Sequence, residues 1–364
     1  MRTKKTRVLA LLLIAALLLV ACGGQTPPPP PPAPPAAPPA GGDAAPAVDA
    51  PPAPSDLTGQ VTLYTSMKES KIGDIVRAFN AEFPNVRVEH YSAGAGRLMA
   101  RIAAEREAGQ IQADMLWTSE VPDFYAMAAD GILHRFIPTA RANGEILSPL
   151  VVESEYFTPA RLAALGIIYN TNHIQTSPTS WEDLMGPDWT GAFAIANPAV
   201  SGTALVSVAM FLEYFGEDFF VRLRENGAMI GGGSGQVVDD TAIGEYFGAL
   251  AVDYIVYDVM DLGATVAMAY PQEMIVIPSP VAIFRDSPNI EAAEAFLEFL
   301  LSPVGQQIVA DQGTTPVRPG MYMAERFNLP PVEEMMERAM RIDFVAMAGT
   351  RQEIIDRVAE LMQA

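Results

Sequence analysis

Cysteine is nearly absent from this chain. Cys22 is the only one among 364 residues, so an internal disulfide is excluded. The three histidines, His90, His134 and His173, are scattered and do not have the spacing of zinc ligands. Positive charge is also scarce, because 23 Lys and Arg residues stand against 43 Asp and Glu residues and the net charge is −20. This balance argues against nucleic acid as a partner and against electrostatic attachment to anionic lipid.

Enzyme motifs are incomplete as well. Residues 232–236 read GGSGQ and lack the final glycine of a nucleophile elbow. The glycines that begin at Gly231 would open a dinucleotide fingerprint, but Gln236 occupies its final glycine position. Asp239 and Asp240 have no recognisable partner carboxylate for acid–base catalysis. We therefore expect a protein that is not an enzyme.

The N-terminus contains a short apolar run, residues 8–21, which follows a basic start and is too short to span a bilayer comfortably. These are the parts of a secretory signal, and residues 19–22, LVAC, resemble the bacterial lipobox. The sequence predicts a signal peptide over residues 1–21 and lipidation of Cys22, which would anchor the protein on the outer face of the cytoplasmic membrane. The alternative is an ordinary secreted protein with a stray cysteine.

Residues 22–56 are dominated by Pro, Ala and Gly, with an uninterrupted proline run at 27–32. Such a stretch cannot bury a core and favours extended polyproline segments. A ligand for a partner domain would have a similar composition, but the position between a lipidated end and a globular body favours a spacer. We expect no fixed structure there.

The body that follows is long enough for two domains, and 50% of the chain is hydrophobic. Strands are predicted at residues 61–64, 86–91 and 113–117. A helix is predicted between the first two, because apolar residues from Ile72 to Phe83 recur at helical spacing. A second helix is predicted to begin at 92–96. Strands and helices that alternate with such short connections indicate a parallel sheet.

The alternation returns after the midpoint of the chain. Further strands are predicted at residues 165–170, 191–196, 249–253, 266–269 and 274–283, and helices at 181–185, 201–212, 291–301, 303–311, 331–341 and 350–362. Two sheets joined by extended segments predict two α/β domains with a crevice between them. Ligands of open parallel sheets bind beyond the carboxyl ends of the strands, so the loops after the strands are the candidates.

Hydroxyl side chains stand at several of these strand-to-helix transitions, namely Ser66, Ser92, Ser201 with Thr203, and Ser234. Helix starts have unpaired N–H groups and partial positive charge, and a hydroxyl there either caps the helix or donates to an anion. Lys68 and Lys71, the only lysines after Lys5, follow the first of these loops. Chance composition and a cationic edge of a binding site explain these two lysines equally well.

Aromatic side chains allow two interpretations. Trp117 ends a predicted strand and either forms a wall of the crevice or packs in the core. Tyr254 and Tyr257 share one face of a predicted helix. Such a pair either ligates ferric iron or serves as packing.

Several segments, in their order along the chain, resemble extracellular solute-binding proteins of ABC importers. They are residues 61–66, 109–120, 130–133, 169–172, 180–184, 187–191, 201–204, 278–283 and 295–306. The order of the segments carries the resemblance, which covers essentially the whole body. It indicates the branch that holds ferric-iron, thiamine, phosphonate and sugar-phosphate binders.

The resemblance implies the α/β type II periplasmic-binding fold, with domain 1 over residues 57–168 plus 281–364 and domain 2 over residues 169–280. Two crossovers, near residues 168–171 and 277–281, would join the domains. Domain closure would trap a small-molecule ligand, and the closed monomer would dock on a membrane permease with its ATPase.

The resemblance, together with the charge of one lysine, also implies a set of ligand-binding residues. They are Ser66, Lys68, Ser92, Gly94, Ala95, Gly96, Trp117, Ser201, Gly202, Thr203, Gln236, Asp253 and Tyr254. The glycines would let a ligand approach the backbone closely, and the hydroxyls and the lysine would supply donors and charge.

The choice between an anion and iron rests on two positions. Iron-binding members usually have adjacent tyrosines near Asp253 and Tyr254, and a histidine where Met67 and Lys68 stand. The sequence therefore favours a small anionic solute, such as a phosphonate or a sugar phosphate, and no cofactor. The alternative is Fe³⁺ held by Tyr254 with Tyr257, Tyr64 or Tyr91. A second alternative is a solute-sensing lipoprotein that passes its signal to a receptor.

Overall fold

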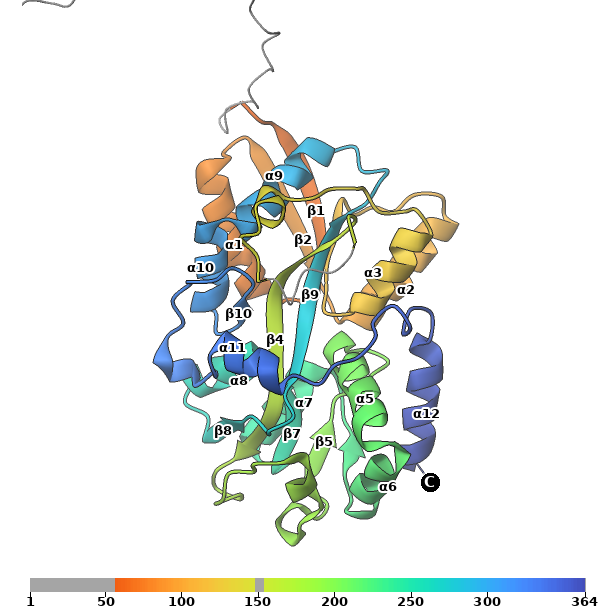
Figure 1. Cartoon of the computed structure of the whole chain (residues 1–364), viewed down its shortest axis with the longest axis vertical. Coiled ribbons are helices and arrows are strands. Elements are labelled where there is room, and N and C mark those ends of the chain that lie inside the picture. The colour runs from red at the N-terminus through yellow and green to blue at the C-terminus, as the bar shows by residue number, and fades with distance from the viewer. Residues whose placement is uncertain (1–55, 148–153, 364) are drawn as a thin grey trace, which may run out of the picture. The chain divides into compact units, whose positions relative to one another are not determined.

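The computed structural model of this chain describes residues 56–147 and 154–363 (Figure 1). The predicted signal peptide, the lipidation site Cys22 and the linker up to residue 55 lie outside the described residues. Within the described part, no helix combines the length and the apolar character that are needed to cross a membrane.

A single hydrogen-bonded sheet of ten strands runs through the described part of the chain. Its main order is β2-β1-β3-β9-β4-β7-β5-β6, and β8 and β10 pair with β4. The strands are β1 (Gly59–Thr65), β2 (Val86–Ser92), β3 (Met115–Trp117), β4 (Thr158–Asn170), β5 (Phe193–Ile195), β6 (Met229–Ile230), β7 (Gly248–Val252), β8 (Val266–Ala269), β9 (Ile275–Ile283) and β10 (Thr315–Pro316). β1 is parallel to β2 and β3, and β5 is parallel to β6 and β7, which confirms the predicted parallel pairing.

The prediction of two separate sheets is wrong, because β4 and β9 run side by side through both halves of the sheet (Figure 1). β4 pairs antiparallel with β9 from Thr158 to Leu165, and then with β7 and β8 up to Asn170. β9 pairs with β3 from Val281 to Ile283. The chain therefore crosses between the halves within residues 158–165 and 275–281. The crossover predicted near 168–171 lies too late along β4.

The helices form two groups around the sheet. The β1 region comprises β1–β3 with α1 (Glu69–Glu82), α2 (Ala95–Glu107), α3 (Val121–Ala129), α9 (Ile290–Leu301) and α10 (Pro303–Asp311). The β7 region comprises β5–β8 with α5 (Gly202–Phe215), α6 (Glu217–Glu225), α7 (Ser234–Ile243), α8 (Asp253–Asp261) and α12 (Arg351–Gln363). Shorter elements are α4 (Thr139–Ala142), α11 (Val332–Arg338), η2 (Trp181–Met185), η3 (Pro187–Trp189) and η4 (Glu325–Phe327).

The C-terminal helix α12 does not lie where the expected domain boundaries would put it. Those boundaries assign residues 281–364 to the domain of β1–β3, but α12 packs against α5 and α6 (Figure 1). The last helix thus joins the β7 region.

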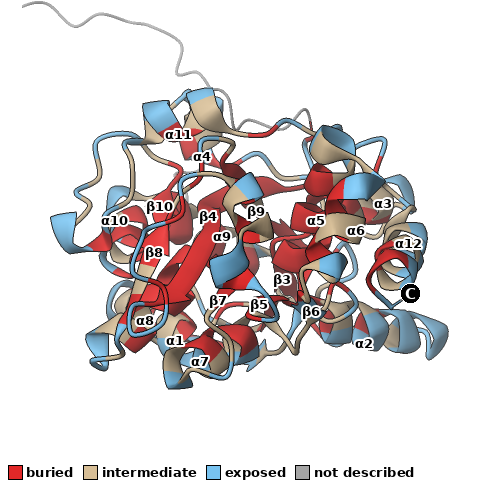
Figure 2. Ribbon diagram, turned by 90° about the horizontal axis from the view of Figure 1, so that it is seen from below, coloured by how far each residue is buried: buried red, intermediate tan, exposed pale blue. Residues whose placement is uncertain are grey.

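The buried residues of the helices face the sheet, and exposed residues lie mainly on outer faces and connections (Figure 2). α1 illustrates the cause, because Ile72, Ile75 and Phe79 recur at helical spacing and are fully buried. Burial of each such side chain stabilises the fold by about 1.5–3 kcal/mol.

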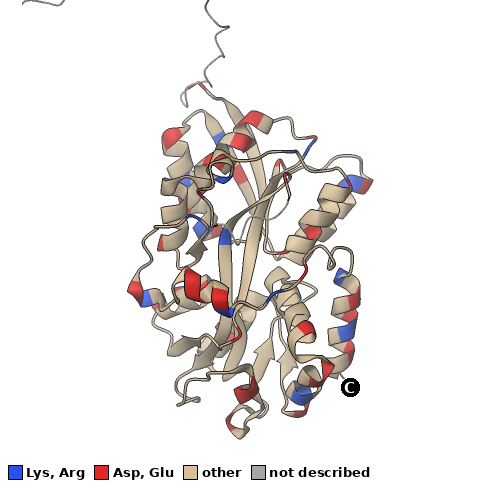
Figure 3. Cartoon of the chain, viewed as in Figure 1, with Lys and Arg blue, Asp and Glu red and all other residues tan. Residues whose placement is uncertain are grey.

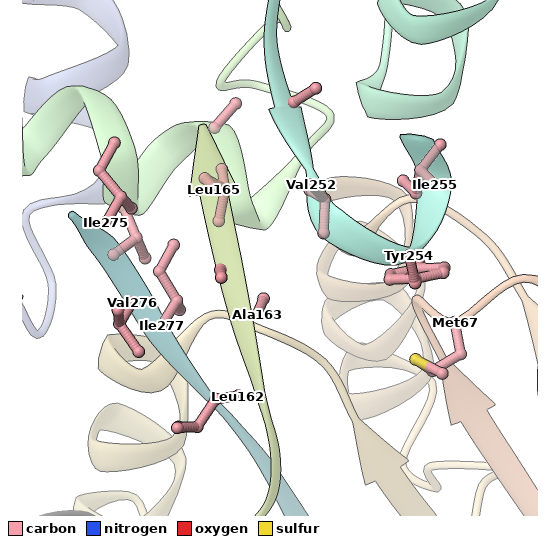
Figure 4. Close-up of a cluster of buried hydrophobic side chains, with 14 of the residues drawn as sticks. Met67, Leu162, Ala163, Leu165, Val252, Tyr254, Ile255, Ile275, Val276 and Ile277 are labelled. Atoms are coloured by element: carbon pink, nitrogen blue, oxygen red, sulfur yellow. The ribbon is translucent and has the colours of Figure 1, made fainter. Parts of the chain in front are cut away.

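The core beneath the crossing strands positions the start of α8. Leu162 and Leu165 of β4 belong to the same buried cluster as Ile277 of β9, and this cluster extends to Tyr254 and Met67 (Figure 4). Charged residues lie mainly on helices and connections (Figure 3). Arg161 is the only charged residue in β4 and β9.

Candidate ligand-binding site

A cavity of about 320 Å³ lies between the β1 region and the β7 region. Its β1 side is formed by Ser66, Met67, Lys68, Ser92, Ala93, Gly94, Ala95 and Ser119. Its β7 side is formed by Val200, Ser201, Gly202, Thr203, Gly233, Ser234, Gly235, Val252, Tyr254 and Ile255, and β4 contributes Arg161. The cavity thus collects residues that end or follow β1, β2, β3, β5, β6 and β7, as the rule for parallel strands predicts.

Five helices begin at this cavity. They are α1, α2, α5, α7 and α8, and the residue directly before each of them lines the cavity. In the same order these residues are Lys68, Gly94, Ser201, Gly233 and Val252. Of these five, only Ser201 caps its helix with a side chain, which accepts the Ala204 N–H at 3.2 Å. No side-chain cap occupies the starts of α1, α2 and α7, so their backbone donors are available to a ligand, whereas at the start of α8 the Tyr254 N–H already donates to Asp253. No Asp or Glu lines the cavity, so its fixed charges and helix dipoles all favour an anion.

Three hydroxyls form a cluster at the starts of α5 and α7. Ser201 Oγ lies 2.7 Å from Ser234 Oγ, and Thr203 Oγ1 lies 3.2 Å from both. Hydroxyl hydrogens rotate freely, so the cluster can turn several donors toward one oxyanion. The glycine-rich segment around Ser234 therefore serves as a helix start at the cavity.

Arg161 lines the cavity and was not among the residues predicted from the sequence. Its side chain is 1% exposed. Nη1 donates to Thr314 Oγ1 at 3.2 Å and Nη2 donates to Ser119 Oγ at 3.3 Å, while Nε is buried without a partner. A lone arginine inside an otherwise apolar strand is the signal that would have identified it, because such charges are rarely buried unpaired.

The two lysines share the carboxylate of Asp258, which does not line the cavity. Lys68 Nζ lies 3.0 Å from Asp258 Oδ2, and Lys71 Nζ lies 2.7 Å from Asp258 Oδ1. Lys68 lines the cavity and Lys71 does not. Since the lysines begin α1 and Asp258 lies on α8, these ion pairs connect the β1 region with the β7 region.

Asp253 and Tyr254 have different surroundings although they are adjacent. Tyr254 lines the cavity, and burial raises its pKa to about 12. Asp253 is fully buried outside the cavity and accepts the N–H groups of Ala164 at 3.0 Å and Tyr254 at 2.7 Å. Burial raises the pKa of Asp253 to about 7, because its charged form loses solvation. Asp253 thus ties α8 to β4.

Three further predicted residues lie outside the cavity. Trp117 is fully buried in the core, where its Nε1 donates to the Ser279 carbonyl at 3.3 Å. Gln236 is exposed on α7 and donates to Asp240 at 2.6 Å. Gly96 lies within α2 and packs against the opposite region, as described below.

The four tyrosines of the ferric alternative are not together. Tyr64 donates to Glu105 at 2.7 Å, and its ring centroid lies 5.7 Å from that of Tyr91, which is 42% exposed. Tyr257 pairs through its hydroxyl with Tyr270 at 2.7 Å. Only Tyr254 of the four lines the cavity. The described residues also contain no group of three or more His, Cys, Asp and Glu that could hold a metal ion.

The two regions touch at the rim of the cavity. A Cβ atom added to Gly94 would lie 2.6 Å from the Val200 carbonyl oxygen, and one added to Gly96 would overlap the Ala199 carbonyl group. Both glycines belong to the start of α2, whereas residues 199–200 lead into α5. The absence of side chains at these two positions allows the regions to approach each other.

A buried charged cluster forms a second contact near the start of α5. Glu120, which follows β3, is fully buried with its carboxyl group against Gly202. Arg351 of α12 donates through Nη1 to Glu120 Oε1 at 2.7 Å and to Asp123 Oδ2 at 3.1 Å. Burial and the neighbouring Asp123 raise the pKa of Glu120 to about 7 even though Arg351 opposes the shift.

Two α/β regions that enclose a cavity of helix starts define the periplasmic-binding-protein fold, as solved structures of such proteins confirm. Residues 61–315 match the family described as bacterial extracellular solute-binding protein, and the chain belongs to this family. Its members capture solutes for ABC transport and are binding proteins, not enzymes. The family and fold that the sequence segments indicated are therefore confirmed.

Individual relatives are more distant. A putative 2-aminoethylphosphonate-binding periplasmic protein of Salmonella typhimurium is 24% identical over 62% of this chain and 68% of its own length. The periplasmic binding protein AfuA from Actinobacillus pleuropneumoniae, solved with fructose-6-phosphate, has a TM-score of 0.72 and 20% identity, over 84% of this chain and 99% of AfuA. Iron-bound HitA from Pseudomonas aeruginosa has a TM-score of 0.70 and 23% identity, over 83% of this chain and 99% of HitA.

Proposed function

We propose that this protein captures a small anionic solute, such as a phosphonate or a sugar phosphate, and delivers it to an ABC permease. The observation that carries the proposal is the cavity itself, where five helix starts, three clustered hydroxyls and two cationic side chains meet without any lining carboxylate. Anions bind at helix N-termini because free N–H groups and the helix dipole both stabilise negative charge.

In this proposal the β1 region and the β7 region are the two closing domains, which hinge at the crossing strands. The protein acts as a monomer that is anchored through lipidated Cys22 on the outer face of the cytoplasmic membrane, with residues 22–56 as its spacer. A gene for a permease and its ATPase beside this one would support an importer over a solute sensor.

A thermal-shift screen tests the anion site. We expect at least one phosphate ester or phosphonate to stabilise the protein, because a ligand at about 100 times its Kd adds about 2.7 kcal/mol to the free energy of unfolding. Ser201→Ala and Lys68→Ala should each weaken that ligand by about tenfold, since a hydrogen bond to a charged group is worth about 1.5–3 kcal/mol.

Lys71→Ala is the matched control, because Lys71 also pairs with Asp258 but does not line the cavity. Its effect on affinity should be clearly smaller than that of Lys68→Ala. If neither Ser201→Ala nor Lys68→Ala changed the affinity of the solute found, the proposed site would be incorrect.

Ferric iron is the second candidate, because the structurally similar HitA was solved with iron bound. Tyrosinate–iron sites have a visible charge-transfer band. We expect the purified protein to remain colourless with ferric salts, since only Tyr254 of the four candidate tyrosines reaches the cavity and burial raises its pKa to about 12. A visible band that disappears in Tyr254→Phe would favour ferric iron over an anionic solute as the ligand.

A further inference from the structure

The cavity contains two separate sets of polar groups. One is the hydroxyl cluster of Ser201, Thr203 and Ser234. The other is centred on Arg161, which bonds to Ser119 and Thr314 and stacks its guanidinium 5.1 Å from the Tyr254 ring centroid. Among the described residues, no hydrogen bond joins the two sets. A ligand that satisfied only one set would leave the other without a partner.

Arg161 is a buried cation without a direct ion pair, although the charge of the neighbouring Asp253 acts on it. No carboxylate of the described residues lies within ion-pair distance of its guanidinium, and Nε has no acceptor. The neighbouring Asp253 uses its oxygens for the N–H groups of Ala164 and Tyr254. Burial raises the pKa of Asp253 to about 7 although the charge of Arg161 opposes the shift, so Asp253 compensates the guanidinium only in part. A buried charge that is compensated only in part costs free energy, so an anionic group that paired with Arg161 would stabilise it.

The same cavity offers nothing to a cationic group. No Asp or Glu lines it, and Lys68 and Arg161 would both repel an ammonium. The face of Tyr254, which could attract a cation, already faces the Arg161 guanidinium. An ammonium taken from water into this cavity would lose its solvation without gaining an acceptor of opposite charge.

We propose that the solute is compact and carries two acid groups, with a phosphate or phosphonate group at the Ser201–Thr203–Ser234 cluster and a second acid group, such as a carboxylate, paired with Arg161. This inference rests on the proposed function and narrows it. The planar guanidinium fork suits a carboxylate, and the cavity of about 320 Å³ leaves room beyond a single phosphate group. A zwitterion that carries an ammonium in place of the second acid is disfavoured.

Calorimetry with three phosphonates of similar length tests this inference on the full mature chain. Phosphonopropionate carries a second acid, propylphosphonate carries none, and aminoethylphosphonate carries an ammonium. We expect phosphonopropionate to bind about tenfold or more tighter than propylphosphonate, which corresponds to one charge-assisted pair. Aminoethylphosphonate should bind most weakly of the three.

Arg161→Met separates the two ends of the site. It should weaken phosphonopropionate much more than propylphosphonate, and so remove the advantage of phosphonopropionate. The variant should fold, because an apolar chain of similar length fills the same space and Asp253 keeps the N–H groups of Ala164 and Tyr254 as donors. Ser201→Ala should instead weaken phosphonopropionate and propylphosphonate by the same factor.

The outcomes distinguish the two proposals. Equal affinities for all three phosphonates, or tightest binding of aminoethylphosphonate, would overturn the second acid group and leave the anion site intact. An advantage of phosphonopropionate that persisted in Arg161→Met would overturn the role of Arg161. If none of the three, and no inorganic phosphate, bound at millimolar concentration, the proposed function would fall together with this inference.

Discussion

Replacing Gly96 with alanine is expected to prevent the two regions from closing and to weaken solute binding by about tenfold or more. The added Cβ would overlap the Ala199 carbonyl group, which is backbone and leads directly into α5. Neither side can yield by a rotamer change, so the regions would have to stay apart. X-ray scattering with saturating solute should then record a more open shape than that of the wild-type protein.

Although Gly96→Ala should weaken binding, it should not lower the stability of the protein without solute. Gly96 lies in α2, and alanine in a helix is favoured over glycine by up to about 1 kcal/mol. The variant should therefore unfold at the same temperature as the wild type without solute, or slightly higher. Gly73→Ala in α1 is the matched control, because its Cβ would meet only Arg77 Nη1 at an ordinary 3.6 Å. If Gly96→Ala bound the solute and closed like the wild type, close contact between Gly96 and Ala199 would not be required for closure.

Local patterns predicted most of the elements. Helices such as α1 and α9 present apolar residues at helical spacing, and the parallel strands are short and bounded by turn residues, so each is visible within a short window of sequence. The site loops followed from the rule that ligands lie at the carboxyl ends of strands. Nine of the residues predicted for the ligand line the cavity: Ser66, Lys68, Ser92, Gly94, Ala95, Ser201, Gly202, Thr203 and Tyr254.

Features that depend on contacts between distant parts of the chain could not be predicted from local sequence patterns. β4 begins at Thr158, but Pro159 and Arg161 interrupt its apolar run, so the strand is visible only from Leu165 onward. The importance of Arg161 depends on Ser119 and Thr314, which are far away in the sequence. The partners of α12 could not be predicted either, because its amphipathic pattern shows that one face is buried but not which region covers it.

Arg351 in this helix makes an unusual contact, because it links α12 to carboxylates of the β1 region. Glu120 is fully buried, and one of its oxygens and the Nη2 atom of Arg351 have no hydrogen-bond partner. Glu120 also packs against Gly202, the first residue of the helix that begins at the hydroxyl cluster. The ion pairs of Arg351 with Glu120 and Asp123 therefore connect the β1 region and the β7 region next to the proposed ligand site.

Arg351→Ala should lower the free energy of unfolding by about 3 kcal/mol at about pH 8, because it leaves buried carboxylates without their cation. Arg357→Ala is the matched control on the same helix. Arg357 pairs with Glu217 and Glu360 at the surface, and exposed pairs of this kind contribute less than about 1 kcal/mol. Urea unfolding of the two variants measures the difference, and equal losses would show that the Arg351 cluster has no special role.

The pH dependence tests whether that loss is electrostatic. In the folded wild type the pKa of Glu120 is raised from 4.5 to about 7. The folded state therefore holds this proton more tightly than the unfolded state, and the contribution of Glu120 to stability falls as pH rises between these values. Without Arg351 that pKa rises further, so the penalty of Arg351→Ala should be largest at about pH 8 and smaller at about pH 5, where Glu120 is protonated. Glu120→Gln should restore most of the stability of Arg351→Ala at the higher pH, because a neutral amide needs no counter-charge. A penalty that was independent of pH and insensitive to Glu120→Gln would mean that Arg351 contributes packing rather than charge.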